Sequence, residues 1–139
     1  MVLIDLHGSP GSQNGFEHSG DVSQINWQEG SNSSFAGPNM YKSLEILQTI
    51  AAKYGSSQYE GVVFGIEIVN EPLGWAPNDF TVTKNWAAVA WNVIKAAATN
   101  PNLYVLTHDS FMGPQNWYDV ASAINGNSQQ SLFGVDIHV

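Results

Sequence analysis

The sequence predicts an α/β fold in which parallel strands alternate with helices. Four short segments rich in Val, Ile and Leu are separated by three segments whose apolar residues recur at the helical period. This order favours a parallel sheet with right-handed crossovers. The chain has 139 residues, of which 43% are hydrophobic, so a single globular domain over residues 1–139 is expected.

The strands are predicted over residues 2–6, 61–69, 103–107 and 132–137, and the helices over residues 39–54, 81–99 and 114–124. Pro72 stops the second strand, because proline has no N–H to donate to a strand ladder. Gly55 suits the C-terminal cap of the first helix, and Pro114 suits the first turn of the third. The loop over residues 8–38 has 31 positions rich in Gly, Ser, Asn and Gln, a length typical of functional or disordered loops.

Composition and charge exclude several classes of function. The formal net charge is −8 and the sequence contains no Arg, so a nucleic-acid partner and an anionic membrane surface are not expected. No apolar stretch approaches the roughly 20 residues of a membrane span. The absence of cysteine excludes a disulfide framework and a thiolate zinc site.

Polar residues end all four predicted strands. They are Asp5 and His7, Asn70 and Glu71, His108 and Asp109, and Asp136 and His138. The carboxyl ends of parallel strands meet at one edge of a sheet, and alternating side chains put Asp5 and His7 on one face of their strand. A single histidine there is more often a structural hydrogen-bonding group. Four polar strand ends at one edge nevertheless indicate a functional site.

Glu71 is the leading candidate for a catalytic group. It stands beside Asn70 at the carboxyl end of its strand, where (β/α)8 barrels carry their catalytic residues. A carboxyl group partly removed from water can keep its proton near neutral pH and deliver it to a leaving group, so a raised pKa is expected in a complete barrel. The structural alternative is that Glu71 only caps the following loop.

Two chemistries fit these residue types. Metal-assisted hydrolysis would use as ligands His7, His108, Asp109 and His138, but their spacing lacks the tight pattern that marks a metal site. Glycoside hydrolysis would use two carboxylates, and Glu71 suits the acid/base. No second Glu ends a predicted strand, which leaves Asp109 and Asp136 as partners.

Two motifs carry a resemblance to a known family. Residues 5–16, DLHGSPGSQNGF, and residues 65–74, GIEIVNEPLG, resemble fungal exo-β-1,3-glucanases, which are family 5 glycoside hydrolases (cellulase family A). The first motif is long and specific for that subgroup, whereas the second is shared more widely. Residues 108–111 and 135–138 follow in the order that the family would show, so the resemblance extends over the whole chain.

The resemblance implies roles for several residues. Glu71 would be the acid/base, and Asn70 would contact the 2-hydroxyl of the sugar. His7 and His138 would line the subsite of the sugar being cleaved. Phe16 resembles an aromatic that clamps the substrate at the pocket mouth, although the residue alone could equally be a loop anchor. Glu17 and His18 follow where the family more often has Asp and Asn.

The resemblance also implies an incomplete (β/α)8 TIM barrel, about strands three to six with their helices, because a full barrel takes about 250 residues. The chain would then be an internal fragment of a retaining glucan exo-1,3-β-glucosidase. It would carry the acid/base half of the site, with the nucleophile beyond Val139 and a substrate-binding Arg before Met1. We therefore expect the isolated chain to be inactive.

The whole enzyme would act on β-1,3-glucan or a related β-glucoside without a cofactor or metal. It would be secreted or located in the cell wall, although this chain carries no signal peptide. A non-catalytic carbohydrate-binding remnant and a metal-dependent TIM-barrel hydrolase are the alternatives.

Overall fold

The protein is a four-stranded parallel sheet flanked by helices. The structure is a computed structural model and describes residues 1–126 and 131–138. The strands are β1 (Val2–Asp5), β2 (Val63–Glu67), β3 (Tyr104–His108) and β4 (Phe133–Asp136), paired in the order β1-β2-β3-β4. The helices are α1 (Pro38–Tyr54), α2 (Phe80–Ala97) and α3 (Tyr118–Asn125), with short 3-10 turns η1 (Glu17–Ser19), η2 (Ser57–Tyr59) and η3 (Pro114–Trp117). The predicted α/β class and parallel strands are confirmed.

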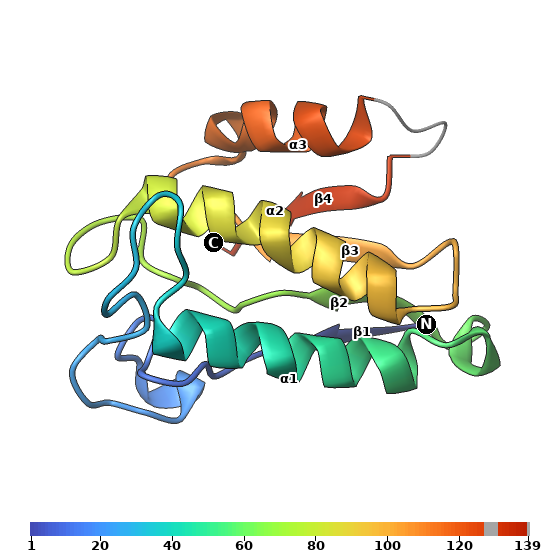
Figure 1. Ribbon diagram of the computed structural model, residues 1–139, viewed down its shortest axis with the longest axis horizontal. Coiled ribbons are helices and arrows are strands. Elements are labelled where there is room, and N and C mark those ends of the chain that lie inside the picture. The colour runs from blue at the N-terminus through green and yellow to red at the C-terminus, as the bar shows by residue number, and fades with distance from the viewer. Residues whose placement is uncertain (127–130, 139) are drawn as a thin grey trace.

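The hydrophobic core lies between the sheet and the helices. Figure 1 shows α1 and α2 side by side along one side of the sheet, with α3 next to α2. Ile66, Ile68 and Val105 point from the strands into this layer and are fully buried. Trp27 and Trp86 meet edge to face with ring centroids 5.0 Å apart, a favourable aromatic geometry.

Local sequence signals set the ends of the two long helices. α1 begins with Pro38 in its first turn and ends at Gly55, whose N–H donates to the carbonyl of Ala51. α2 begins after Asp79, whose side chain accepts hydrogen bonds from the N–H groups of Thr81 and Val82. The expected cap at Gly55 is therefore confirmed.

Two predicted elements differ from the structure. β2 is shorter than residues 61–69, because the chain is still turning before it, with the N–H of Val62 bonded to the carbonyl of Tyr59. The third helix begins as the 3-10 turn η3 and becomes α-helical only at Tyr118. Buried Trp117 fixes this junction by donating its indole N–H to the carbonyl of Asp109.

The face of the sheet turned away from the core carries acidic side chains. The register pairs Asp5 with Glu67, and Asp136 follows Gly134, which pairs with Leu106. This alternation places Asp5, Glu67 and Asp136 on the face opposite Ile66. The loops that follow the strands gather at one end of the molecule, on the left in Figure 1. The carboxyl ends of the strands therefore meet at one edge, as expected.

None of the helices in residues 1–126 and 131–138 has the length and apolar character that a membrane crossing requires.

Candidate active site

Glu71 adopts an unusual backbone conformation just beyond the end of β2. Its φ of 46° lies in the left-handed region, which few non-glycine residues occupy. Its carbonyl oxygen accepts a hydrogen bond of 3.1 Å from Asn14 Nδ2, so the loop after β1 holds this conformation. Left-handed residues of this kind cost about 1–3 kcal/mol and cluster at functional sites. The geometry therefore marks Glu71 independently of its side chain.

Two imidazoles hold the Glu71 carboxylate. His138 Nδ1 lies 2.7 Å from Oε1, and His18 Nε2 lies 2.7 Å from Oε2. A carboxylate only accepts hydrogen bonds, so each imidazole donates an N–H to its own oxygen. His138 comes from the end of β4 and His18 from η1, so two distant segments converge on one acid.

The hydrogen bonds reverse the effect of burial on Glu71. Burial raises the pKa of its carboxyl group, but the hydrogen bonds from His138 and His18 outweigh burial and leave the pKa below its ordinary value. In turn, the hydrogen bond to Glu71 raises the pKa of His138, despite the opposing effect of burial. In this chain Glu71 is therefore ionised at neutral pH. The raised pKa expected in a complete barrel, with a second carboxylate nearby, stays a prediction.

A second carboxyl group nearby does keep its proton. Glu67 is only 3% exposed, and burial, aided by the charges of Asp5 and Asp136, raises its pKa to about 8. Its buried Oε1 has no hydrogen-bond partner in the part of the chain that the structure describes. Burial also raises the pKa of Asp5, although His7 Nδ1 lies 2.6 Å from its Oδ2. Glu67 and, in part, Asp5 are thus withdrawn from water.

The glycine- and amide-rich loop after β1 is fastened to the end of β2. Gln13 is fully buried, and its Nε2 donates to the carbonyl oxygens of His7 and Asn70, at 2.9 Å each. Its Oε1 accepts the N–H of Ser9 at 3.0 Å. The carbonyl oxygen of Gln13 accepts a hydrogen bond from Asn78 Nδ2 at 2.9 Å. The loop is therefore an ordered wall of the site.

The four residues considered as metal ligands do not form one cluster. His7 pairs with Asp5, and both oxygens of Asp109 accept backbone N–H groups, from Phe111 and Gly113. Asp109 thus shapes the loop after β3. His108 is fully buried, and its Nδ1 accepts the N–H of Ser110 at 3.0 Å.

Two other groups bring possible ligand atoms within 4.8 Å of one another: Glu71, His108 and His138, and Glu67, Asp136 and His138. The first already contains the 2.7 Å hydrogen bond between His138 Nδ1 and Glu71 Oε1. Two ligands of one tetrahedral zinc ion would lie roughly 3.3 Å apart, given metal–ligand distances of about 2.0 Å. Burial lowers the pKa of His108, whose neutral ring then carries its proton on Nε2 and offers no lone pair. The first group therefore favours a hydrogen-bonded carboxylate over a metal centre.

The structure gathers the other predicted site residues around Glu71 in different environments. His7 is exposed, and its ring lies 6.0 Å from that of His18. Asn70 is buried, and its Nδ2 has no hydrogen-bond partner within residues 1–126 and 131–138. Phe16 is half-buried, and its ring lies 5.3 Å from that of His18.

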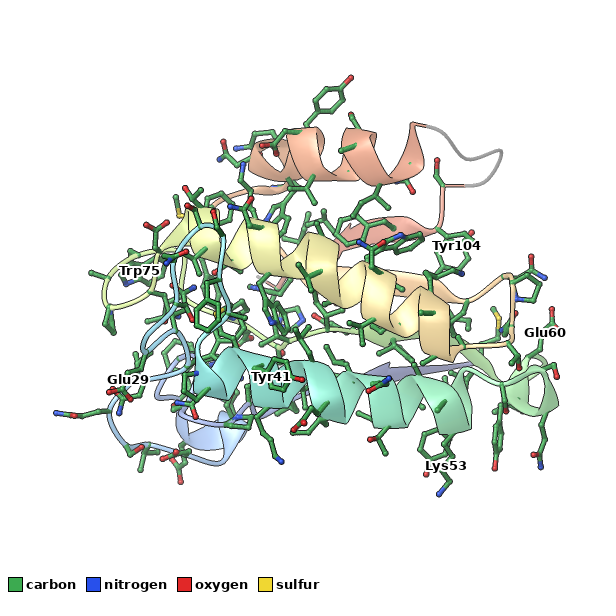
Figure 2. The ribbon with its side chains drawn as sticks, in the orientation of Figure 1. Glu29, Tyr41, Lys53, Glu60, Trp75 and Tyr104 are labelled. Carbon is green, nitrogen blue, oxygen red and sulfur yellow. The ribbon has the colours of Figure 1, made fainter. Side chains whose placement is uncertain are left out.

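An exposed aromatic row extends from the site. The ring centroid of Phe111 lies 6.4 Å from that of Phe16 and 5.9 Å from that of Trp75. Trp75 is 50% exposed and Phe111 39% exposed. Figure 2 shows Trp75 at the end of the molecule where the strand-end loops gather, opposite the end that carries Lys53 and Glu60. Such rings, apolar and accessible, suit the faces of sugar rings.

Sequence reasoning missed two contributors to this site. Trp75 lies four residues beyond Glu71, and this short distance from the polar end of the strand was the available signal. His18 was noted only as a departure from the family pattern, and its contact with Glu71 spans 53 positions in the sequence.

The chain is similar to fungal glucan 1,3-beta-glucosidases. It is 39% identical over 127 residues to glucan 1,3-beta-glucosidase 1 of Schizosaccharomyces pombe, a match that covers 91% of this chain and 29% of the relative. It is 52% identical over 73 residues to the glucan 1,3-beta-glucosidase of Schwanniomyces occidentalis, covering 52% of this chain and 16% of the relative. The Blumeria graminis enzyme of the same name is 38% identical over 116 residues, covering 84% of this chain and 24% of the relative.

These matches confirm the resemblance that the two motifs predicted. The chain spans less than a third of the length of each of these relatives. No protein-family model matches the chain.

Proposed function

We propose that this chain is the acid/base-bearing part of a retaining glucan exo-1,3-β-glucosidase. Its four parallel strands would be about the third to sixth of a (β/α)8 barrel, with the site at the carboxyl ends of the strands. The similarity to fungal glucan 1,3-beta-glucosidases and the parallel order of the sheet support this proposal. The substrate would be β-1,3-glucan or a related β-glucoside.

The observation that carries the proposal is the convergence of three strand ends on one carboxylate. Glu71 follows β2, His138 follows β4, and the loop after β1 reaches Glu71 through both Asn14 and His18. A structural cap would not need a left-handed backbone and two imidazole partners from distant segments. A carboxyl group that exchanges a proton with a ligand requires fixed orientation, and these contacts supply it.

The proposed reaction has two steps. In the first, protonated Glu71 gives its proton to the glycosidic oxygen as that bond breaks, while a glutamate from another part of the barrel bonds to the sugar carbon. In the second, ionised Glu71 takes a proton from water, which attacks the same carbon and releases the nucleophile. His138 would orient Glu71 through its hydrogen bond to Oε1 in both steps.

The remaining site residues would bind the sugar. Asn70 has a buried amide nitrogen without a partner among the described residues, and we propose that it donates to the 2-hydroxyl. His7 and His138 would line the subsite of the cleaved sugar. Phe16 would cover the neighbouring sugar, since its ring starts the exposed aromatic row with Phe111 and Trp75.

The test is a chimera in which this chain replaces the matching segment of the Schizosaccharomyces pombe relative. We expect the chimera to hydrolyse a soluble β-1,3-glucan and to release product with retained configuration. Glu71→Ala should abolish polysaccharide cleavage, whereas the exposed control Glu29→Ala should not. Azide should restore turnover of an activated aryl glucoside by Glu71→Ala, because a small anion can replace the base-assisted water. Unchanged polysaccharide cleavage in Glu71→Ala would exclude the acid/base assignment.

A carbohydrate-binding role without chemistry is the second candidate. The lowered pKa of Glu71 favours it, because an ionised carboxylate accepts hydrogen bonds from sugar hydroxyls and has no proton to give. A chimera that binds the glucan but does not cleave it, with binding weakened by Trp75→Ala, would support this role over the first.

A further inference from the structure

The two oxygens of Glu71 have partners of different character. Oε1 is hydrogen-bonded to His138, which lies two residues beyond the end of β4. Oε2 is bonded to His18, which lies in the short turn η1 and has a side chain that is 56% exposed. A proton placed on Oε2 would therefore face an imidazole nitrogen at 2.7 Å instead of a ligand.

The turn that carries His18 is fixed to the acid it contacts. Asn14 Nδ2 donates both to Ser19 Oγ at 2.9 Å and to the carbonyl oxygen of Glu71 at 3.1 Å. On its other side the turn lies against Gly8, where an added Cβ would be only 2.6 Å from the carbonyl oxygen of Ser19. The turn is thus held against Glu71 by its backbone and by Asn14, whereas the side chain of His18 is 56% exposed.

We infer that His18 is a positioning residue that covers Oε2 of Glu71 and must swing away before this oxygen can reach a glycosidic oxygen. The inference rests on the proposed function. It assigns Oε2 to the ligand because the side chain of His18 is 56% exposed, against 36% for His138. His138 also faces a second acid, with its Nε2 3.5 Å from Asp136 Oδ2. A sugar entering the site would take the place of the His18 ring, and Glu71 would lose one donor to its charged form.

This exchange links ligand binding to protonation. Among residues 1–126 and 131–138, the titratable groups that face Glu71 are His18 from η1, His138 after β4, His108 from β3 and Glu67 from β2. Of these, His138 and His18 hold the pKa of Glu71 down against the effect of burial. Removing the hydrogen bond from His18 leaves burial less opposed, so the pKa of Glu71 rises when the acid is needed as a proton donor.

The experiment follows the carboxyl carbon of Glu71 by NMR in the full 139-residue chain labelled with ¹³C-glutamate. The Glu71 signal is assigned by its loss in Glu71→Gln. We expect His18→Asn to raise the pKa of Glu71 by about one unit, the size typical of a lost hydrogen bond to a charged group. The control is His7→Asn, which removes the neighbouring imidazole that pairs with Asp5 and should leave the Glu71 pKa unchanged. An unchanged pKa in His18→Asn would overturn the inference.

A wild-type measurement covers the case in which His18→Asn does not fold. In the ¹⁵N-histidine-labelled chain, the hydrogen bond to Glu71 should shift the His18 Nε2 signal, and addition of a β-1,3-linked glucose disaccharide should remove that shift. A His18 signal that is the same in wild type and Glu71→Gln would contradict the contact, and a shift that persists at saturating disaccharide would contradict its displacement. None of these measurements records hydrolysis. The inference about His18 can therefore fail while the chimera is active, and it can hold while the chimera is inactive.

Discussion

At the scale of the residue, Glu71 has two features that are unfavourable for the free energy of folding and that a functional role explains. Its backbone is left-handed, and its carboxylate is shielded from water by the imidazoles that hold it. Glycine enters the left-handed region without a steric penalty, so a glycine would fold more easily at this position. The sequence instead places there a side chain that must be held in position by contacts from two other segments.

We predict that Glu71→Gly is more stable than Glu71→Ala by about 1 kcal/mol, because both lose the same side-chain contacts and only alanine retains the strain. Urea unfolding of the two variants measures the difference. The matched pair is Glu29→Gly and Glu29→Ala, at an exposed position without a positive φ, where alanine should be the more stable. A Glu71→Ala variant as stable as Glu71→Gly would show that the backbone is relaxed.

The second residue-scale prediction concerns Glu67. Its pKa of about 8 in the folded chain lies above the ordinary value of 4.5, so the folded state binds this proton more tightly. The contribution of protonated Glu67 to the free energy of unfolding is fully present below about pH 4.5. It is lost as the pH rises through 8. Glu67→Gln should remove this loss, making the variant more stable than wild type at pH 8 by on the order of a few kcal/mol.

Denaturant unfolding at pH 5 and pH 8 checks the prediction for Glu67, with the exposed Glu29→Gln as control. The wild-type chain should lose more stability between these pH values than Glu67→Gln does. Equal losses in the two proteins would mean that Glu67 titrates normally.

The sequence predicted part of this site and missed part of it for a physical reason. Glu71 and Asn70 could be predicted because a strand, a proline and a polar pair leave a recognisable pattern. The pKa of Glu71 could not, because its direction depends on His18, whose position is set by hydrogen bonds of a loop without periodicity. Burial alone would raise this pKa, whereas the two imidazole hydrogen bonds lower it in this chain.

At the scale of the element, the loop between β1 and α1 is the part that makes the site. In this loop, hydrogen bonds from amide side chains replace the backbone hydrogen bonds of regular secondary structure. Gln13 alone makes three hydrogen bonds to the backbone, at Ser9, His7 and Asn70. Buried polar groups of this kind stabilise only when every partner is satisfied. The loop therefore behaves as a structural element that joins the ends of β1 and β2.

We predict that Gln13→Ala destabilises the chain by about 3 kcal/mol, because each of its three hydrogen bonds contributes about 1 kcal/mol. Urea unfolding measures this loss, and the exposed Gln24→Ala in the same loop should cost little. If Gln13→Ala were as stable as Gln24→Ala, the loop would not be fastened through this side chain.

Helices and strands were easier to predict than the junctions between them. The period of apolar residues located α1 and α2 to within two residues at each end, because both bury a continuous stripe against the sheet. The third helix was predicted as one piece and is two, since buried Trp117 and the turn at Asp109 impose η3 before α3. A contact between side chain and distant backbone has no period, so the sequence pattern did not reveal it.

At the scale of the whole molecule, the sheet has one covered face and one acidic face. Helices pack on the side of Ile66 and Ile68, whereas Asp5, Glu67 and Asp136 occupy the other. Glu67 is the buried acid of this face, and placing it near the charges of Asp5 and Asp136 is unfavourable unless it keeps its proton, as its raised pKa indicates. This face suits the polar interior at the top of a barrel better than a second hydrophobic layer.

The last prediction is that the 139-residue chain alone has no measurable activity on β-1,3-glucan. Both stereochemical routes of glycoside hydrolysis need a second carboxylate at a defined separation, about 5–5.5 Å for retention and 6.5–9.5 Å for inversion. The nearest described acid on β2, Glu67, is buried and keeps its proton at neutral pH, so it is a poor nucleophile. Asp136 faces His138, whose Nε2 lies 3.5 Å from its Oδ2.

Assay of the purified chain on a soluble β-1,3-glucan, beside Glu71→Gln, tests this prediction. Equal background release from both proteins is expected, while the chimera with the fungal relative is active. Hydrolysis by the chain that disappears in Glu71→Gln would contradict it and would identify a partner acid within these residues. Asp136→Asn and Asp109→Asn would then separate the two candidates, because Asp109 already gives both oxygens to backbone N–H groups and its loss should act through folding.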